Sequence, residues 1–209
     1  TKDTVRYKYL AKTLLMNRKK ILMSGPTGTG KTVNISELLG SDMPKEYIPI
    51  TLTFSAQTSA NQTQDIIDGK MEKRQRGTFG PAAGSVFVIF VDDLNMPLKE
   101  TYGAQPPIEI LRQWCDFSGW YDRKERVFRK IIDTVIMAAM GPPGGGRNSI
   151  TARFVRHFNV INYTPMDDDS MRTIFETILA NFCLPTPDTV KQLVPAVVLS
   201  TISVYNSSI

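Results

Sequence analysis

Residues 25–32 spell Gly-Pro-Thr-Gly-Thr-Gly-Lys-Thr, which matches the pattern G-x-x-x-x-G-K-[ST] at every fixed position. The pattern is specific when a strand precedes it and a helix follows it. Residues 21–23 are a short apolar run typical of a buried strand, and residues 33–39 suit a helix. A chance glycine-rich turn is therefore a poor explanation, and the stretch predicts a phosphate-binding loop.

Each residue type in this loop has a role in holding phosphates. The glycines let backbone N–H groups turn inward, Lys31 reaches the β- and γ-phosphates, and the Thr32 hydroxyl binds Mg²⁺. The helix that begins here adds the positive end of its dipole. We therefore predict that ATP or ADP binds with Mg²⁺ through the whole loop: Gly25, Pro26, Thr27, Gly28, Thr29, Gly30, Lys31 and Thr32.

A second signal is the run of apolar residues at 86–91, which ends in Asp92 and Asp93. A strand that is apolar at every position is typical of the covered centre of a parallel sheet. In P-loop NTPases an acid at this strand tip holds Mg²⁺. Two acids at a strand end are common, but the position about sixty residues after Lys31 favours a site. We predict that Asp92 binds the metal and that Asp93 acts as the general base.

Two arginines, Arg153 and Arg156, stand three residues apart before the last predicted strand. At that spacing they reach the same side of a helix end. One hypothesis is an arginine finger, which stabilises charge on a phosphoryl group held by a neighbour. The other is a pair of surface arginines, and the spacing does not choose between them. His157, the single histidine, is predicted to be structural, and the loop 142–146 is predicted to shape the backbone without forming a site.

The rest of the chain alternates strands with helices, which predicts a parallel sheet with helices on both faces. This is an α/β three-layer sandwich of the P-loop NTPase type. We expect a large nucleotide-binding subdomain at 1–165 and the beginning of a helical lid at 166–209. Further strands are expected at 47–54, within 131–140 and at 158–163, a hairpin at 120–122 and 126–129, a loop at 77–84, and helices at 5–17, 59–73, 105–117, 170–182 and 188–200, the last broken or kinked at Pro195.

Composition excludes several classes of protein. No run approaches the roughly 18 apolar residues of a membrane span, and the two cysteines among 209 residues do not form a disulfide framework. The net charge of +5 fits a phosphate site on a mildly basic surface. The chain begins with Thr1 and stops after an apolar stretch, so we expect a piece of a longer chain.

Several stretches resemble the third AAA+ module of an axonemal dynein heavy chain. Beyond the phosphate loop they are Phe-Val-Asp-Asp-Leu-Asn-Met-Pro at 90–97, Tyr-Gly-Ala-Gln-Pro-Pro-Ile-Glu at 102–109 and Gly-Trp-Tyr-Asp-Arg at 119–123. Two more are Ala-Ala-Met-Gly-Pro-Pro-Gly-Gly-Gly-Arg-Asn at 138–148 and Arg-Phe-Val-Arg-His-Phe at 153–158. These stretches are specific to dynein and extend over nearly the whole chain as far as Tyr163.

The resemblance implies a function that no spacing shows. Dynein motors carry six such modules in one ring, and the third binds nucleotide and tunes the main ATPase site of the first. Its implied partners are the neighbouring modules and, through regions outside this chain, intermediate chains, light chains and microtubules, without nucleic acid or membrane. The implied location is the cytoplasm and the axoneme of cilia or flagella. By resemblance, Val5 contacts the adenine, and Arg153 and Arg156 point at the second module's nucleotide.

Two departures from the family pattern predict weak hydrolysis. AAA+ ATPases that hydrolyse well usually have Glu where this chain has Asp93. Where a polar sensor, commonly Asn, should follow the strand within 131–140, this chain has Gly141. The module is therefore expected to bind nucleotide better than it hydrolyses it.

Two other functions remain open from the sequence. One is an independent AAA+ ATPase that remodels protein or nucleic acid, although no basic-aromatic stripe or known nucleic-acid motif supports it. The other is a P-loop kinase, which would need an acceptor pocket that the sequence does not indicate.

Overall fold

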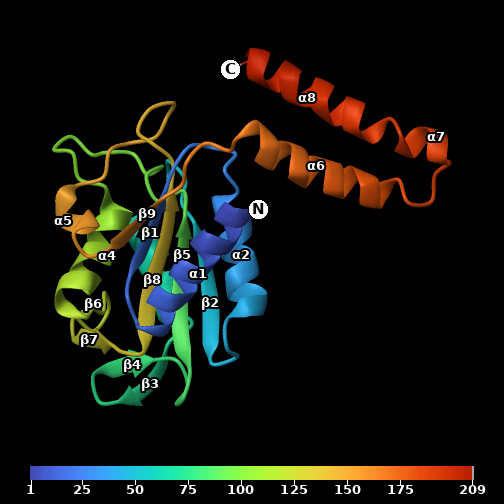
Figure 1. Cartoon of the computed structure of the whole chain (residues 1–209). Coiled ribbons are helices and arrows are strands. Elements are labelled where there is room, and N and C mark those ends of the chain that lie inside the picture. Colours follow the sequence, from blue (N-terminus) through green and yellow to red (C-terminus); the bar gives the residue numbers. More distant parts are fainter. Residues whose placement is uncertain (209) are drawn as a thin grey trace. The chain divides into compact units, whose positions relative to one another are not determined.

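A five-stranded parallel sheet carries the phosphate loop (Figure 1). Its strands run in the order β2-β5-β8-β1-β9, and every neighbouring pair is parallel. Their bounds are β1 Ile21–Ser24, β2 Tyr47–Thr53, β5 Val86–Asp92, β8 Thr134–Met140 and β9 Asn159–Asn162. This computed structural model describes residues 1–208. The order places the ends of β5, β8 and β1 side by side, which positions the site.

Helices cover both faces of the sheet, as the sequence predicts. On one face lie α1 (Lys2–Met16) and α2 (Lys31–Glu37), which continues as a π-helix, η1 (Leu38–Asp42). On the other lie α3 (Ala60–Asp68), α4 (Pro106–Phe117) and α5 (Ala152–Val155). Along β5, Val86, Val88 and Phe90 pack with the first group, whereas Phe87, Ile89 and Val91 pack with the second. This alternation explains why β5 is apolar at every position.

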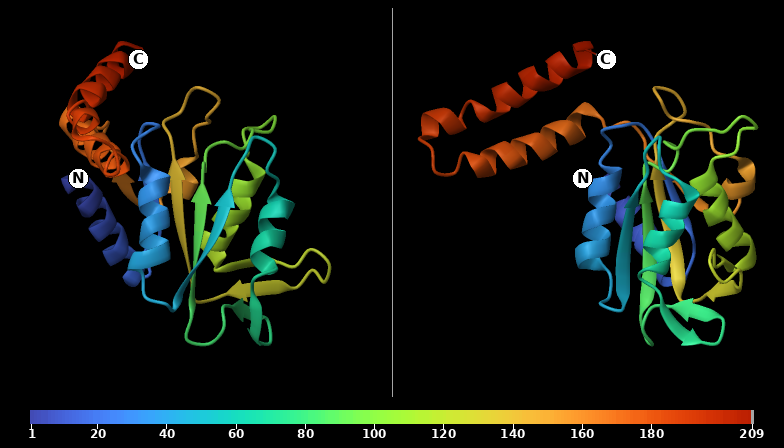
Figure 2. Two further views of the ribbon diagram at one scale, coloured as in Figure 1. Left: turned by 90° about the vertical axis from the view of Figure 1, so that its right-hand side faces the viewer. Right: turned by 180° about the vertical axis from the view of Figure 1, so that it is seen from behind.

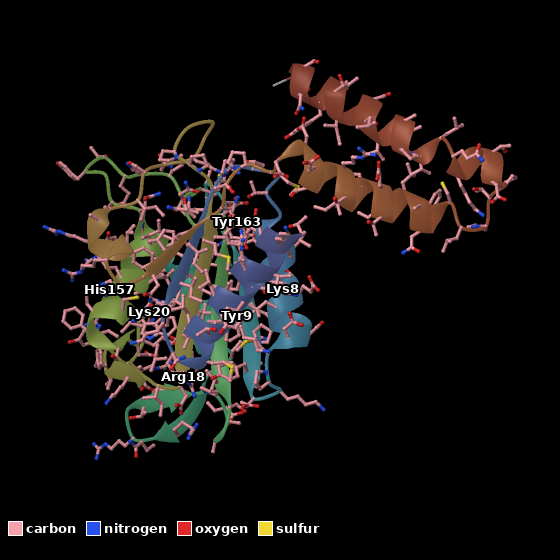
Figure 3. The ribbon with its side chains drawn as sticks, viewed as in Figure 1. Lys8, Tyr9, Arg18, Lys20, His157 and Tyr163 are labelled. Atoms are coloured by element: carbon pink, nitrogen blue, oxygen red, sulfur yellow. The ribbon has the colours of Figure 1, made fainter. Side chains whose placement is uncertain are left out.

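The helix predicted at 5–17 is present as α1, but its large apolar side chains are only partly the ones that it buries. Val5, Tyr9 and Leu10 are exposed and Leu14 packs partly buried against the core, whereas the residues that α1 buries fully are Ala11 and Leu15. Large apolar side chains are common on protein surfaces, so their spacing did not identify the face. Tyr163, which follows β9 and is labelled in Figure 3, stacks on Tyr7 with ring centroids 3.9 Å apart.

A smaller sheet lies where β5 and β8 begin, at the end away from the phosphate loop (Figure 2). Its order is β3-β4-β7-β6, with bounds β3 Glu72–Gln75, β4 Thr78–Gly80, β6 Gly119–Tyr121 and β7 Phe128–Ile131. The antiparallel pair β6–β7 confirms the predicted hairpin.

Two local predictions fail at this smaller sheet. The helix predicted over 59–73 stops at Asp68, and the predicted loop at 77–84 contains β4. Residues 72–75, Glu-Lys-Arg-Gln, have no strand propensity of their own, so only their pairing with β4 makes them a strand.

The C-terminal residues form α6 (Asp168–Phe182), α7 (Asp188–Lys191) and α8 (Val194–Ser208). The predicted helix at 188–200 is thus two helices, and Pro195 stands in the first turn of α8, where its missing N–H is tolerated. Met171, Val198 and Ile202 form a small core between α6 and α8.

The chain divides into two compact units, Arg6–Tyr163 and a second that joins Thr1–Val5 to the residues from Thr164 onward. The first unit contains the five-stranded sheet and the phosphate loop. No helix among residues 1–208 is long and apolar enough to span a bilayer.

Candidate functional site

Three chain segments meet at the carboxyl ends of β1, β5 and β8 and enclose a cavity of about 300 Å³. Ligands of open α/β sheets bind at this edge, and the volume is at the lower end of the range for ligand pockets. Figure 2 shows the loop after β8 beside the phosphate loop. The lining residues are Thr27, Gly28, Gly30, Lys31, Thr32, Val33, Asp92, Asp93, Met140, Gly141 and Arg147.

The phosphate loop folds around its own lysine. Lys31 Nζ donates to the carbonyl oxygens of Gly25 at 2.8 Å and Pro26 at 2.6 Å, and lies 3.2 Å from Thr29 Oγ1. Burial, and then the charge of Arg147, lower the pKa of Lys31. The Lys31 side chain is partly buried. Since phosphate oxygens are stronger acceptors than these carbonyls, the loop fits a phosphate chain.

Thr32 and Asp92 come together as the metal prediction requires. Thr32 Oγ1 donates to Asp92 Oδ2 at 2.9 Å, while Asp92 Oδ1 accepts from the backbone N–H of Asp93 at 3.0 Å. Residues 1–208 contain no cluster of three or more His, Cys, Asp or Glu that could hold a metal. Mg²⁺ commonly binds through one or two carboxylates plus phosphates and waters. The pair therefore fits Mg²⁺ that arrives with a nucleotide.

Asp93 has an unusual backbone conformation at the tip of β5. Its φ is 51°, in the left-handed region that Asp and Asn enter more readily than other non-glycine residues. Its side chain is 44% exposed, and Oδ1 lies 3.7 Å from Arg147 Nη2. Residues held in this region cluster at functional sites. The structure therefore places Asp93 in the cavity beside an arginine that the sequence did not single out.

Arg147 is the site residue that sequence reasoning missed. Its Nη1 lies 3.2 Å from Thr27 Oγ1, so it contacts the phosphate loop as well as Asp93. The signal that could have found it is a single basic residue in the glycine-rich loop after a central strand. That signal becomes informative only once β8 is known to lie between β5 and β1.

Arg153 and Arg156 lie on or beside α5, both exposed, and neither lines the cavity. Arg156 Nη2 donates to Asp116 Oδ1 at 2.8 Å. His157 Nε2 lies 2.9 Å from the same oxygen, and Arg112 pairs with the other. His157 is on the side of the sheet that carries α4 and α5 (Figure 3). An action of the two arginines on a neighbouring module remains a prediction.

The Asp116 cluster predicts a pH-dependent stability. The hydrogen bond from Arg156, followed by the charges of Arg156, His157 and Arg112, lowers the pKa of Asp116 in the folded chain. The stabilising effect of the ionised Asp116 carboxylate is therefore present above the unfolded pKa of about 3.9 and is lost as the pH falls through the lower folded value.

Asp116→Asn should lower the melting temperature at pH 7, and the difference in melting temperature between wild type and variant should shrink below about pH 4. Thermal unfolding by circular dichroism, with the exposed Glu72→Gln as control, checks this, and an equal difference at both pH values would contradict it.

Val5 belongs to the unit that holds Thr1–Val5, not to the unit that holds the phosphate loop. Its predicted contact with adenine therefore stays a prediction.

A family model described as the P-loop containing dynein motor region matches residues 1–166. The chain belongs to this family. A P-loop dynein motor region binds nucleotide, generally with Mg²⁺, which agrees with the geometry around Lys31, Thr32 and Asp92.

Similar proteins are axonemal dynein heavy chains. Dynein axonemal heavy chain 1 of Homo sapiens is 56% identical over 183 residues, which are 87% of this chain and 4% of that protein. Dynein axonemal heavy chain 12 of Mus musculus is 50% identical over 86% of this chain and 6% of its own length. Dynein axonemal heavy chain 6 of Homo sapiens is 44% identical over 99% of this chain and 5% of its own length. The dynein motor region described here thus spans a small part of the relatives that it matches.

Proposed function

We propose that this chain is the third AAA+ module of an axonemal dynein heavy chain and that it binds ATP or ADP with Mg²⁺ to regulate the motor's main ATPase site. The observation that carries the proposal is the meeting of Lys31, Thr32 and Asp92 in one cavity at the carboxyl edge of the sheet. The dynein-specific stretches and the family match support the module's place in a motor. They also favour this function over an independent remodelling ATPase.

The roles of the phosphate loop and the two acids agree with the geometry of the cavity, whereas those of Arg153, Arg156 and Val5 rest on the resemblance alone. The loop Gly25–Thr32 binds the phosphates, Thr32 and Asp92 bind Mg²⁺, and Asp93 is the candidate general base. Arg153 and Arg156 act on the neighbouring module's nucleotide, and Val5 contacts adenine. In this proposal residues 1–165 form the nucleotide-binding subdomain and 166–209 part of the lid.

The whole motor supplies the remaining partners and the location. The similar proteins are axonemal dynein heavy chains, so we propose that this module works in the axoneme of cilia or flagella. Its direct partners are the adjacent AAA+ modules of the same chain. Microtubules, intermediate chains and light chains bind through regions outside these residues.

The deciding experiment is to identify the nucleotide that stays with the purified chain by mass, and then to titrate nucleotide-free protein with fluorescent ADP and ATP analogues. A retained adenine nucleotide and saturable binding that needs Mg²⁺ for full affinity support the proposal. Failure to bind either analogue by a well-folded chain would contradict it.

Nucleotide binding by the solitary chain should not depend on Arg153 or Arg156. Both side chains are exposed and lie outside the cavity that Lys31 lines. We expect that Arg153→Ala and Arg156→Ala each leave ADP and ATP affinity within about 2-fold of the wild type, because surface substitutions away from a site change free energies by at most about 0.5 kcal/mol. The same fluorescence titration measures this. A large loss of affinity in either variant would place that arginine in the chain's own site.

A further inference from the structure

The loop after β8 holds Arg147 in a defined place. Gly144 and Arg147 exchange two backbone hydrogen bonds of 3.0 Å, with Gly145 and Gly146 between them. The φ angles of Gly145 and Gly146, 57° and 86°, are those of a tight two-residue turn with both central residues left-handed. Such a turn favours glycine at both positions. The Gly-Gly pair therefore sets the direction from which Arg147 enters the cavity.

A buried asparagine ties both ends of this loop to the segment after β5. Asn95 is 1% exposed, and its Nδ2 donates to the carbonyl oxygen of Gly141 at 2.8 Å. The backbone carbonyl oxygen of Asn95 accepts from the backbone N–H of Asn148 at 2.9 Å. Asn148 Nδ2 also donates to the carbonyl oxygen of Pro97 at 2.9 Å. Arg147 is thus fixed between a tight turn on one side and a braced asparagine on the other.

The guanidinium of Arg147 has fewer acceptors than it can use. Nη1 makes one bond to Thr27 Oγ1 at 3.2 Å, and Nη2 makes a long ion pair with Asp93 at 3.7 Å. Nε is buried and has no hydrogen-bond partner within the described residues 1–208. A buried charged donor without an acceptor is destabilising. The position therefore suits an anionic ligand that supplies acceptors.

Gly141 makes room for this side chain. A Cβ atom built at position 141 would lie 2.8 Å from Arg147 Nε and 2.9 Å from its Cδ. Any other residue at 141 would have to move the guanidinium. The chain thus has glycine where a polar sensor is expected, and a cation fills the space beside it.

We propose that Arg147 binds the terminal phosphate of ATP held by the same chain, so that the site discriminates ATP from ADP. This inference rests on the proposed function. Thr32 and Asp92 would hold the Mg²⁺ that accompanies the nucleotide and would supply positive charge beside its phosphates. The guanidinium lies between the phosphate loop and Asp93. Asp93 stands where the attacking water is expected, so this is the side of the cavity on which the γ-phosphate would lie. The planar guanidinium matches phosphate oxygens with two parallel N–H donors.

Asp93 has a second role in this arrangement. Its carboxylate holds Nη2 of Arg147 at 3.7 Å, with both side chains partly exposed. Exposed ion pairs of this kind are weak, so a phosphate can replace Asp93 as the partner of the guanidinium. Binding of ATP, but not of ADP, then releases Asp93 from Arg147. The same contacts argue against a mainly structural role, because one long hydrogen bond and one long ion pair stabilise little.

The test compares ATP and ADP affinity in Arg147→Ala, with the exposed Arg76→Ala as a control of equal charge change. The dissociation constants of ADP and of a non-hydrolysable ATP analogue are measured by fluorescence titration. We expect Arg147→Ala to weaken the ATP analogue by about 10- to 100-fold, the value of a hydrogen bond to a charged group. ADP affinity should change by less than about 3-fold, and Arg76→Ala should change neither affinity, because Arg76 is exposed and is not among the residues that line the cavity.

A second variant guards against a folding defect. Gly141→Ala keeps the arginine but displaces its guanidinium, so it should also lower the preference for ATP. Thermal unfolding confirms that each variant is folded. If both variants keep the wild-type ratio of ATP to ADP affinity, or lose both affinities equally, the inference is overturned while the nucleotide site stands. If the folded wild type binds neither nucleotide, the proposed function itself fails.

Discussion

Lys31→Ala should remove measurable ADP and ATP binding without unfolding the chain. The ammonium group of Lys31 is the positive charge that the loop holds where the phosphates are expected. Its Nζ lies 2.8 Å from the carbonyl oxygen of Gly25 and 2.6 Å from that of Pro26. Charge-assisted hydrogen bonds to phosphate are about twice as strong as neutral ones. Losing two or three of them lowers affinity by about 100-fold or more. The side chain is outside the apolar clusters of the sheet, so its loss leaves no core cavity.

Calorimetry with ADP measures this effect, and Lys70→Ala is a matched control because Lys70 is exposed in the turn after α3. The melting temperature of Lys31→Ala should stay within a few degrees of the wild type. Unchanged ADP affinity in a folded Lys31→Ala variant would show that nucleotide binds elsewhere.

The fold and the core of the site could be predicted because they depend on local patterns. The loop 25–32 needs only a strand before it and a helix after it, and both are visible in the sequence. The apolar run at 86–91 could be assigned to the sheet centre because every residue on it faces one of two helical layers. Asp92 then had to lie at the strand tip, within reach of Thr32.

The parts that could not be predicted depend on which segments the fold brings together. Residues 72–75 form a strand only because β4 lies alongside, and α1 presents Ala11 and Leu15 to the sheet in place of larger residues. Arg147 enters the cavity because β8 lies between β5 and β1 and because two glycines turn the loop. No spacing within one segment encodes a contact between Arg147, Thr27 and Asp93.

The isolated chain should bind ATP far better than it hydrolyses it. A general base must reach the attacking water with a hydrogen bond of about 2.6–3.2 Å, and Asp93 is one methylene shorter than the usual Glu. In this structure Asp93 Oδ1 also lies 3.7 Å from Nη2 of Arg147, so the carboxylate must leave this ion pair before it can reach the water. Gly141 has no side chain to hold the water from the other side. Losing one positioning donor slows a reaction by about 10²–10³-fold.

The isolated chain also lacks the arginine finger that an adjacent AAA+ module would supply to its active site. An arginine finger contributes about 10³–10⁵ to the rate, and in this chain Arg153 and Arg156 lie outside the cavity. Arg147 does not replace the finger fully, because in the arrangement proposed above it binds the γ-phosphate before the reaction, and binding that is equal in the ground state and the transition state does not raise the rate. We therefore expect steady-state phosphate release close to the uncatalysed background. Asp93→Glu alone should raise it little, because Gly141 and the missing finger are unchanged.

Ground-state binding depends on different atoms from those that hydrolysis needs, so the two activities can separate. We propose that the loop amides, Lys31, Thr32 and Asp92 hold the ligand; Lys31, Thr32 and Asp92 line the same cavity. A phosphate-release assay on the same preparation used for the titrations makes the comparison direct, and Lys31→Ala corrects for a contaminating ATPase. Turnover at about 1 s⁻¹ or faster, within the ordinary range for enzymes, that disappears in Lys31→Ala would contradict a mainly regulatory site. Slow turnover with tight binding is what a module that reports its nucleotide to its neighbours requires, because the bound state must outlast the cycle that it regulates.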